Sequence, residues 1–89
     1  MKDNEILDIV KKVLSELNSE TNIKNRIDLD TELFRDLNLD SLLFSNLILS
    51  MEEAFDVPIE NDLLFEADLI TVGDLVELMK KAQLAMKGA

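Results

Sequence analysis

The residues best placed to carry chemistry lie in one short segment, Asp36-Leu37-Asn38-Leu39-Asp40-Ser41-Leu42. A strongly apolar stretch follows, so Ser41 stands where a loop would end and a helix would begin. The N–H groups of a first helical turn have no partners within the helix and carry partial positive charge. A phosphate attached to Ser41 would lie close to these donors. The position fits a modification site, and it fits equally well a serine that only caps the helix.

A calcium loop is a second possibility for the same segment. Asp36, Asn38 and Asp40 match the first three ligand positions of an EF-hand. The next position requires glycine and is Ser41, while the twelfth requires a bidentate glutamate and is Leu47. These two departures exclude a tight calcium site and leave at most weak binding of divalent ions. We therefore expect no metal centre.

The composition excludes most self-contained catalytic chemistry. The chain of 89 residues contains no Cys and no His, so thiolate nucleophiles, disulfides and imidazole bases are all absent. The adjacent acids Glu52 and Glu53 would point in different directions on a helix, so they do not form an acid–base pair. We interpret them as surface charge or as a docking site for a partner. The sequence predicts a protein that is not an enzyme.

The charge is large and unevenly distributed. The net charge is −10, which disfavours nucleic acid and anionic membranes as partners. Residues 36–79 contain eleven acids and no Lys or Arg, so this segment carries −11 and the rest of the chain carries +1. It is either a solvated acidic surface or a docking face for basic partners. No apolar run approaches the length of a membrane span. We expect a cytoplasmic monomer without stable membrane insertion.

The surrounding pattern predicts an all-α fold, a small four-helix bundle with three main helices and a short third one. Apolar residues at helical spacing indicate helices over 3–18 and 41–55, a short helix over 60–67 and a last helix from Thr71. Asp40 or Ser41 could cap the second helix, and Thr71 with Asp74 forms a weak capping box for the last. A long loop, 19–40, joins the first two helices and contains enough apolar residues to pack over the bundle. The chain is expected to be a single domain, 1–89, with its core over about 3–82 and a frayed tail over 83–89.

Several motifs resemble those of the acyl carrier proteins. Asp40-Ser41-Leu42 is similar to the attachment motif of that family, and Phe34-Arg35-Asp36-Leu37 precedes it as in the family. The end of the second helix, Glu52-Glu53-Ala54-Phe55-Asp56-Val57, and the start of the last, Thr71-Val72-Gly73-Asp74-Leu75, are also similar. The spacing is consistent over about residues 5 to 81.

The resemblance implies a carrier with 4′-phosphopantetheine on Ser41, flanked by Asp40 and Leu42. A phosphopantetheinyl transferase would install the arm from coenzyme A. Its thiol would hold an acyl group as a thioester for acyl-loading and acyl-processing enzymes. The pathway would be a specialised fatty-acid, polyketide or related one. An acyl chain can tuck between the helices of such proteins, which makes Leu47 and Met51 candidate cavity residues.

The chain also departs from the family pattern. Asn38 stands where the family usually has glycine, and asparagine tolerates a left-handed backbone better than most residues. Leu43 and Asn46 stand where fatty-acid carriers usually have acids. With Phe44 beside Leu43, the surface after Ser41 would be unusually apolar, as at a partner site, unless these two side chains pack under the long loop. The expected partner-docking residues are Leu43, Phe44, Asn46, Leu47, Glu52 and Glu53.

Two alternatives remain open from sequence. An adaptor that only binds other proteins would also be a helical bundle with an apolar patch, but it would not depend on Ser41. An aminoacyl or peptidyl carrier would share the scaffold and the arm and would differ in its cargo.

Overall fold

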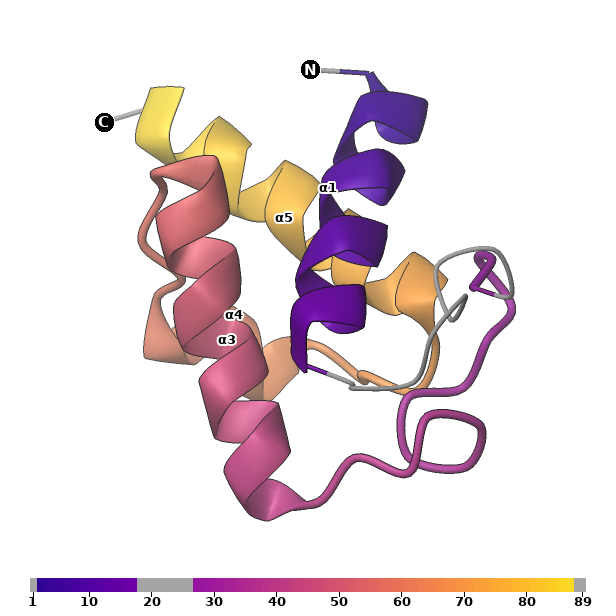
Figure 1. Cartoon of the computed structure of the whole chain (residues 1–89). Coiled ribbons are helices and arrows are strands. Elements are labelled where there is room, and N and C mark those ends of the chain that lie inside the picture. The colour runs from indigo at the N-terminus through magenta and orange to yellow at the C-terminus, as the bar shows by residue number, and fades with distance from the viewer. Residues whose placement is uncertain (1, 18–26, 88–89) are drawn as a thin grey trace.

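The computed structural model describes residues 2–17 and 27–87, and the side chain of Lys87 is not described. Four helices make up the regular structure of these residues: α1 (Asp3–Leu17), α3 (Ser41–Phe55), α4 (Asn61–Glu66) and α5 (Val72–Lys87). Helix α1 packs against both α3 and α5, and the short α4 packs against α5 (Figure 1). The predicted all-α bundle with a short third helix is confirmed.

The end of the last helix differs from that predicted, and the predicted end of the first helix is not tested. The first helix is described to Leu17, and its predicted end near Asn18 lies outside the described residues. Helix α5 continues to Lys87, whereas we expected fraying from residue 83. Ala82 is still buried at that point, while Leu84 and Met86 are exposed. The last turn therefore projects from the bundle as a helix with little packing of its own.

The core is built from the apolar faces of the three long helices. Ile6 and Val10 of α1, Leu47 and Met51 of α3, and Leu75 of α5 are completely buried. Spacings of three and four residues place such side chains on one face of each helix. Their removal from water is the main stabilising contribution to so small a domain.

The described part of the long loop, 27–40, is held to the start of α5 by backbone hydrogen bonds. The N–H of Gly73 donates to the carbonyl of Leu29, and the N–H of Val72 donates to that of Thr31, each over 2.9 Å. The N–H of Leu33 donates to Ile70, also over 2.9 Å. A Cβ at residue 73 would lie 3.1 Å from the Leu29 oxygen, so glycine permits this close approach. The segment that leads into α3 is thus anchored to the start of α5.

The start of α5 is closed by the predicted capping box. Asp74 Oδ2 accepts the N–H groups of Ile70 and Thr71 over 2.9 Å each, and the N–H of Asp74 donates to Thr71 Oγ1 over 3.3 Å. The hydrogen bond from the Thr71 backbone, followed by that from Ile70, lowers the pKa of Asp74 although partial burial opposes the shift. The box stabilises the helix end on which the long loop rests.

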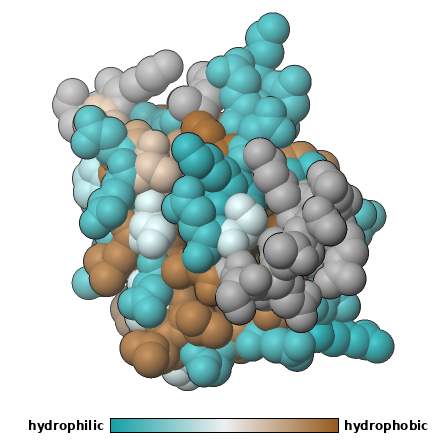
Figure 2. Space-filling model, in the orientation of Figure 1, coloured by the Kyte–Doolittle hydropathy of each residue, from teal (hydrophilic) through white to brown (hydrophobic). Residues whose placement is uncertain are grey.

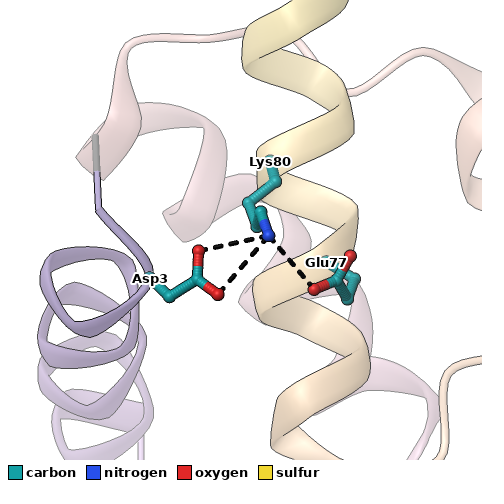
Figure 3. A network of polar contacts seen from close by, with 3 residues as sticks. All are labelled: Asp3, Glu77 and Lys80. Atoms are coloured by element: carbon teal, nitrogen blue, oxygen red, sulfur yellow. Dashed lines mark hydrogen bonds and ion pairs between the residues drawn. The ribbon is translucent and has the colours of Figure 1, made fainter.

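One ion-pair network joins α1 to α5 (Figure 3). Lys80 Nζ lies 3.1 Å from Asp3 Oδ1 and 3.4 Å from Glu77 Oε1. Hydrogen bonding to Asp3, then to Glu77, raises the pKa of Lys80. All three side chains are reached by solvent, so the network adds little to stability but places an ammonium group among acids.

Candidate functional site

Ser41 is the first residue of α3 and its side chain is exposed. Of the two possible capping residues, the structure uses Asp40, whose extended backbone precedes the helix and whose Oδ1 accepts the Leu43 N–H over 2.8 Å. The Asp40 carbonyl accepts the Phe44 N–H, also over 2.8 Å. Since Asp40 supplies the cap, the Ser41 hydroxyl has no capping role. Helix α3 begins at the lower end of the molecule in Figure 1.

The turn before Asp40 depends on Asn38. Its φ is 56°, in the left-handed region where glycine is most at ease, and asparagine is among the few other residues that adopt it readily. The N–H of the following Leu39 donates to the carbonyl of Leu33 over 3.3 Å. As predicted, asparagine adopts the left-handed backbone that this turn requires. The turn directs the chain into α3.

The acids of this segment serve the backbone. Asp36 Oδ2 accepts the N–H of Glu32 over 2.8 Å, and the N–H of Asp36 donates back to the Glu32 carbonyl over 3.0 Å. Asp40 is engaged in the cap. Among the described residues no three acids come together in a way that could hold a metal ion. The carboxylates that match an EF-hand in sequence thus act as local hydrogen-bond acceptors.

The outward face of α3 carries two exposed leucines, seven residues apart. Leu42 is 71% exposed and Leu49 is 60% exposed. Ser45 and Asn46 lie between them and are exposed as well. No charged residue occurs from Ser41 to Met51. Figure 2 shows apolar surface over the first turns of α3, so an uncharged, partly apolar strip begins at Ser41.

Leu43 and Phe44 are half-buried and pack against the core. The Phe44 ring lies 5.6 Å from that of Phe34 in the long loop, centroid to centroid, at an interplanar angle of 36°. Such a tilted pair is a favourable aromatic arrangement. Of the two possibilities left open by the sequence, packing under the loop describes these side chains. The exposed strip is formed instead by Leu42 and Leu49.

Leu47 and Glu52 were predicted to meet partners, and the structure gives both another role. Leu47 is 0% exposed, because it lies on the face of α3 that forms the core. Glu52 is half-buried and its Oε2 accepts the N–H of Ile59 over 2.9 Å, which ties the end of α3 to the segment after it. Leu47 is therefore closed to a partner, whereas Glu52 is partly accessible although one of its oxygens is engaged. Asn46 and Glu53 remain exposed.

A shallow groove of about 390 Å³ separates α1 from the second half of α3. Small side chains, Ser50 and Ala54, form its α3 wall beside Glu53, and Ile9 and Val13 face them from α1. Leu47 and Met51 do not line this groove. Both are fully buried, so the described structure shows them as closed core.

No described helix is long and apolar enough to cross a membrane.

Comparison with known proteins agrees with this site. A family model described as a phosphopantetheine attachment site matches residues 4–79. An acyl carrier protein of Desulforapulum autotrophicum is 41% identical over 73 residues, which cover 81% of this chain and 90% of that protein. Acyl carrier proteins of Borrelia garinii subsp. bavariensis and Borreliella burgdorferi are each 36% identical over 81 residues, or 91% of this chain and 96% of theirs.

The fold and the matched attachment-site model define a carrier domain, a protein that holds a covalent prosthetic group for other proteins to act upon. The chain belongs to the acyl carrier protein family. The cofactor of this family is covalently attached 4′-phosphopantetheine, whose terminal thiol supplies the thioester chemistry that a chain without Cys lacks.

The start of α3 fits such a group. The Ser41 hydroxyl is exposed. The N–H groups of Ser41 and Leu42 lie in the first turn of α3, where backbone donors have no acceptor within the helix. The carboxylate of Asp40 is turned onto the N–H of Leu43. A phosphodiester on Ser41 would therefore meet two unpaired donors at the positive end of the helix dipole.

Proposed function

We propose that Ser41 carries 4′-phosphopantetheine and that the protein presents acyl thioesters on this arm to partner enzymes. The observation that supports this most directly is the exposed Ser41 hydroxyl, freed by the Asp40 cap, at the start of α3 in a chain of this family. In the acyl-transfer steps the reacting thiol belongs to the arm and not to the protein. Its role is to hold and position cargo.

The arm would be transferred from coenzyme A by a phosphopantetheinyl transferase. Ser41 Oγ forms a new bond to phosphorus while the phosphoanhydride bond to the nucleotide part of coenzyme A breaks. The hydroxyl proton passes to a base of the transferase, and adenosine 3′,5′-bisphosphate leaves. The product is a phosphodiester, with the free thiol at the far end of the arm.

Partner enzymes would reach the arm over the exposed strip of α3. We assign Leu42, Asn46 and Glu53 to this contact, together with Leu49, since all four side chains are exposed on that helix. The absence of charge from Ser41 to Met51 makes apolar contact, more than ion pairing, the basis of recognition nearest the arm. This suits a dedicated partner in a fatty-acid, polyketide or related pathway.

The test is the intact mass after incubation with coenzyme A and a broad-specificity phosphopantetheinyl transferase. The parent chain should gain one phosphopantetheine, Ser41→Ala none, and Ser45→Ala one. Ser45 is a matched control because it is exposed on the same helix one turn later. A folded, unmodified parent that gains nothing, or a Ser41→Ala variant that still gains mass, would exclude the proposed attachment.

An aminoacyl carrier would show the same gain but would be loaded by an amino-acid-activating enzyme. The relatives above are all named acyl carrier proteins, which favours acyl cargo. If the protein were an adaptor that only binds other proteins, its Ser41→Ala variant would bind the partner as well as the parent does. Mass spectrometry of the thioester released from protein isolated from its own cells separates acyl from aminoacyl cargo.

A further inference from the structure

A second groove lies away from Ser41, between the start of α1 and the start of α5. Its volume is about 520 Å³, within the range of protein ligand sites. The first turn of α1 and the start of α3 stand at opposite ends of the molecule in Figure 1. A molecule bound in this groove would leave the start of α3 accessible.

The groove has an apolar floor. Val76 of α5 is buried, Leu7 of α1 is half-buried, and Leu29 of the long loop contributes a wall although it is 49% exposed. These three side chains come from three separate parts of the chain. The backbone hydrogen bond from Gly73 to Leu29 fixes the loop against α5, so the wall is held in place. The hollow is thus preformed and offers water-exposed apolar surface to a ligand.

The rim of the groove is acidic. Asp3, Asp30 and Glu77 are exposed around it, and Asp74 lies beside them with its carboxylate engaged by backbone N–H groups. Among the described residues that line the groove there is no Lys or Arg. An apolar floor within a negatively charged border complements a ligand that combines an apolar side chain with flanking cations.

The protein's own Lys80 shows how this rim receives a cation. Its ammonium group is held between Asp3 and Glu77, although Lys80 itself does not line the groove (Figure 3). A carboxylate has two oxygens and several acceptor positions, so these acids can take further donors. Asp30 has no ion pair in the described structure, so its carboxylate can bind a cationic group of the ligand.

We propose that this groove binds a basic amphipathic segment of a partner protein, with an apolar side chain on Leu7, Leu29 and Val76 and flanking Lys or Arg on the acidic rim. Because the groove lies away from the start of α3, the partner can hold the carrier while the Ser41 region stays accessible. The carrier would then be tethered through one surface and served by enzymes through another, which raises the effective concentration of the arm.

The experiment uses a synthetic amphipathic Lys/Leu helical peptide as the probe, added to isotope-labelled protein. Backbone amide shifts should change at residues 3–7, 29–30 and 73–77. Two matched peptides separate the contributions: a Lys/Ser peptide keeps the charge without the apolar face, and a Glu/Leu peptide reverses the charge. Both should bind at least about tenfold more weakly, because each loses one of the two required kinds of contact.

Two variants test the site itself. Leu29→Ser and Glu77→Gln should each weaken binding of the Lys/Leu peptide, by about tenfold for the apolar wall. Their controls are Leu84→Ser and Asp62→Asn, which remove an exposed leucine and an exposed acid elsewhere and should leave the affinity unchanged. Circular dichroism confirms that every variant is folded.

Shifts centred on α3, equal affinity of Leu29→Ser and Leu84→Ser, or no binding of the Lys/Leu peptide would overturn the proposal. Ser41→Ala should bind the peptide like the parent, and Leu29→Ser should still accept phosphopantetheine. The docking groove and the attachment site can therefore fail independently.

Discussion

Asn38 shows how a single residue keeps the site in shape. Its left-handed backbone turns the chain just before the Asp40 cap, and its exposed side chain makes no other demand. Asn38→Ala should lower the free energy of unfolding by about 1 kcal/mol, since alanine adopts this region at a cost of about 1–2 kcal/mol, more than asparagine incurs. Asn38→Gly should lie within about 0.5 kcal/mol of the parent. Urea unfolding measures both.

The comparison between the two variants carries that test. If Asn38→Ala and Asn38→Gly are equally stable, the left-handed backbone at residue 38 contributes no strain, and the turn is set by the loop contacts instead. A rate of Ser41 modification that falls for Asn38→Ala alone would further show that the turn presents the serine to the transferase.

At the scale of the element, α3 separates a core face from an exposed face within three residues. Leu47→Ala should lower the free energy of unfolding by about 2–5 kcal/mol, because it leaves a cavity among buried side chains. Leu49→Ala should change it by less than about 0.5 kcal/mol, since Leu49 is mostly in water. Chemical unfolding of the two variants measures both changes. Equal losses of free energy of unfolding would mean that α3 is rotated from the orientation described.

The sequence predicts that α3 exists but does not say which of its faces is buried. Leu42, Leu43, Phe44, Leu47, Ile48 and Leu49 surround the helix almost completely. Periodicity selects a face only when polar residues occupy the opposite one. The assignment of Leu47 to the docking surface arises from this ambiguity, which only the packing of α1 and the loop resolves.

The contacts of the long loop could not be predicted from sequence either, whereas the capping box could, because its residues are close together in the chain. Thr71 and Asp74 are three residues apart, so their reciprocal hydrogen bonds could be predicted from sequence alone. The hydrogen bond from Gly73 to Leu29 joins residues far apart in the chain and leaves no periodic signal. The groove between α1 and α5 depends on that long-range contact, and so it could not be found before the fold was known.

The capping box makes stability depend on pH in a definite direction. Asp74 has a lowered pKa in the folded protein, chiefly through the hydrogen bond from the Thr71 backbone, relative to an ordinary value of 3.8. The folded state therefore binds this proton less readily than the unfolded state does. The stabilisation is complete above the ordinary pKa and is lost as the pH falls through the lowered one.

Asp74→Asn removes this titration. The parent should lose more of its free energy of unfolding between pH 7 and pH values below 3.8 than the variant loses. Urea unfolding at a series of pH values measures both curves, which should converge in acid. Parallel curves over the whole range would show that the Asp74 carboxylate does not stabilise the start of α5 through its charge.

At the scale of the whole molecule, a net charge of −10 on 89 residues sets the response to salt. The eleven acids of residues 36–79 repel one another in the compact state, and salt screens exposed charges over about 10 Å at 0.1 M. Added NaCl should therefore raise the Tm, by less in a variant with Glu53→Gln, Glu66→Gln and Asp68→Asn, three exposed acids. A Tm that falls with salt would mean that ion pairs such as Lys80 with Asp3 outweigh the repulsion.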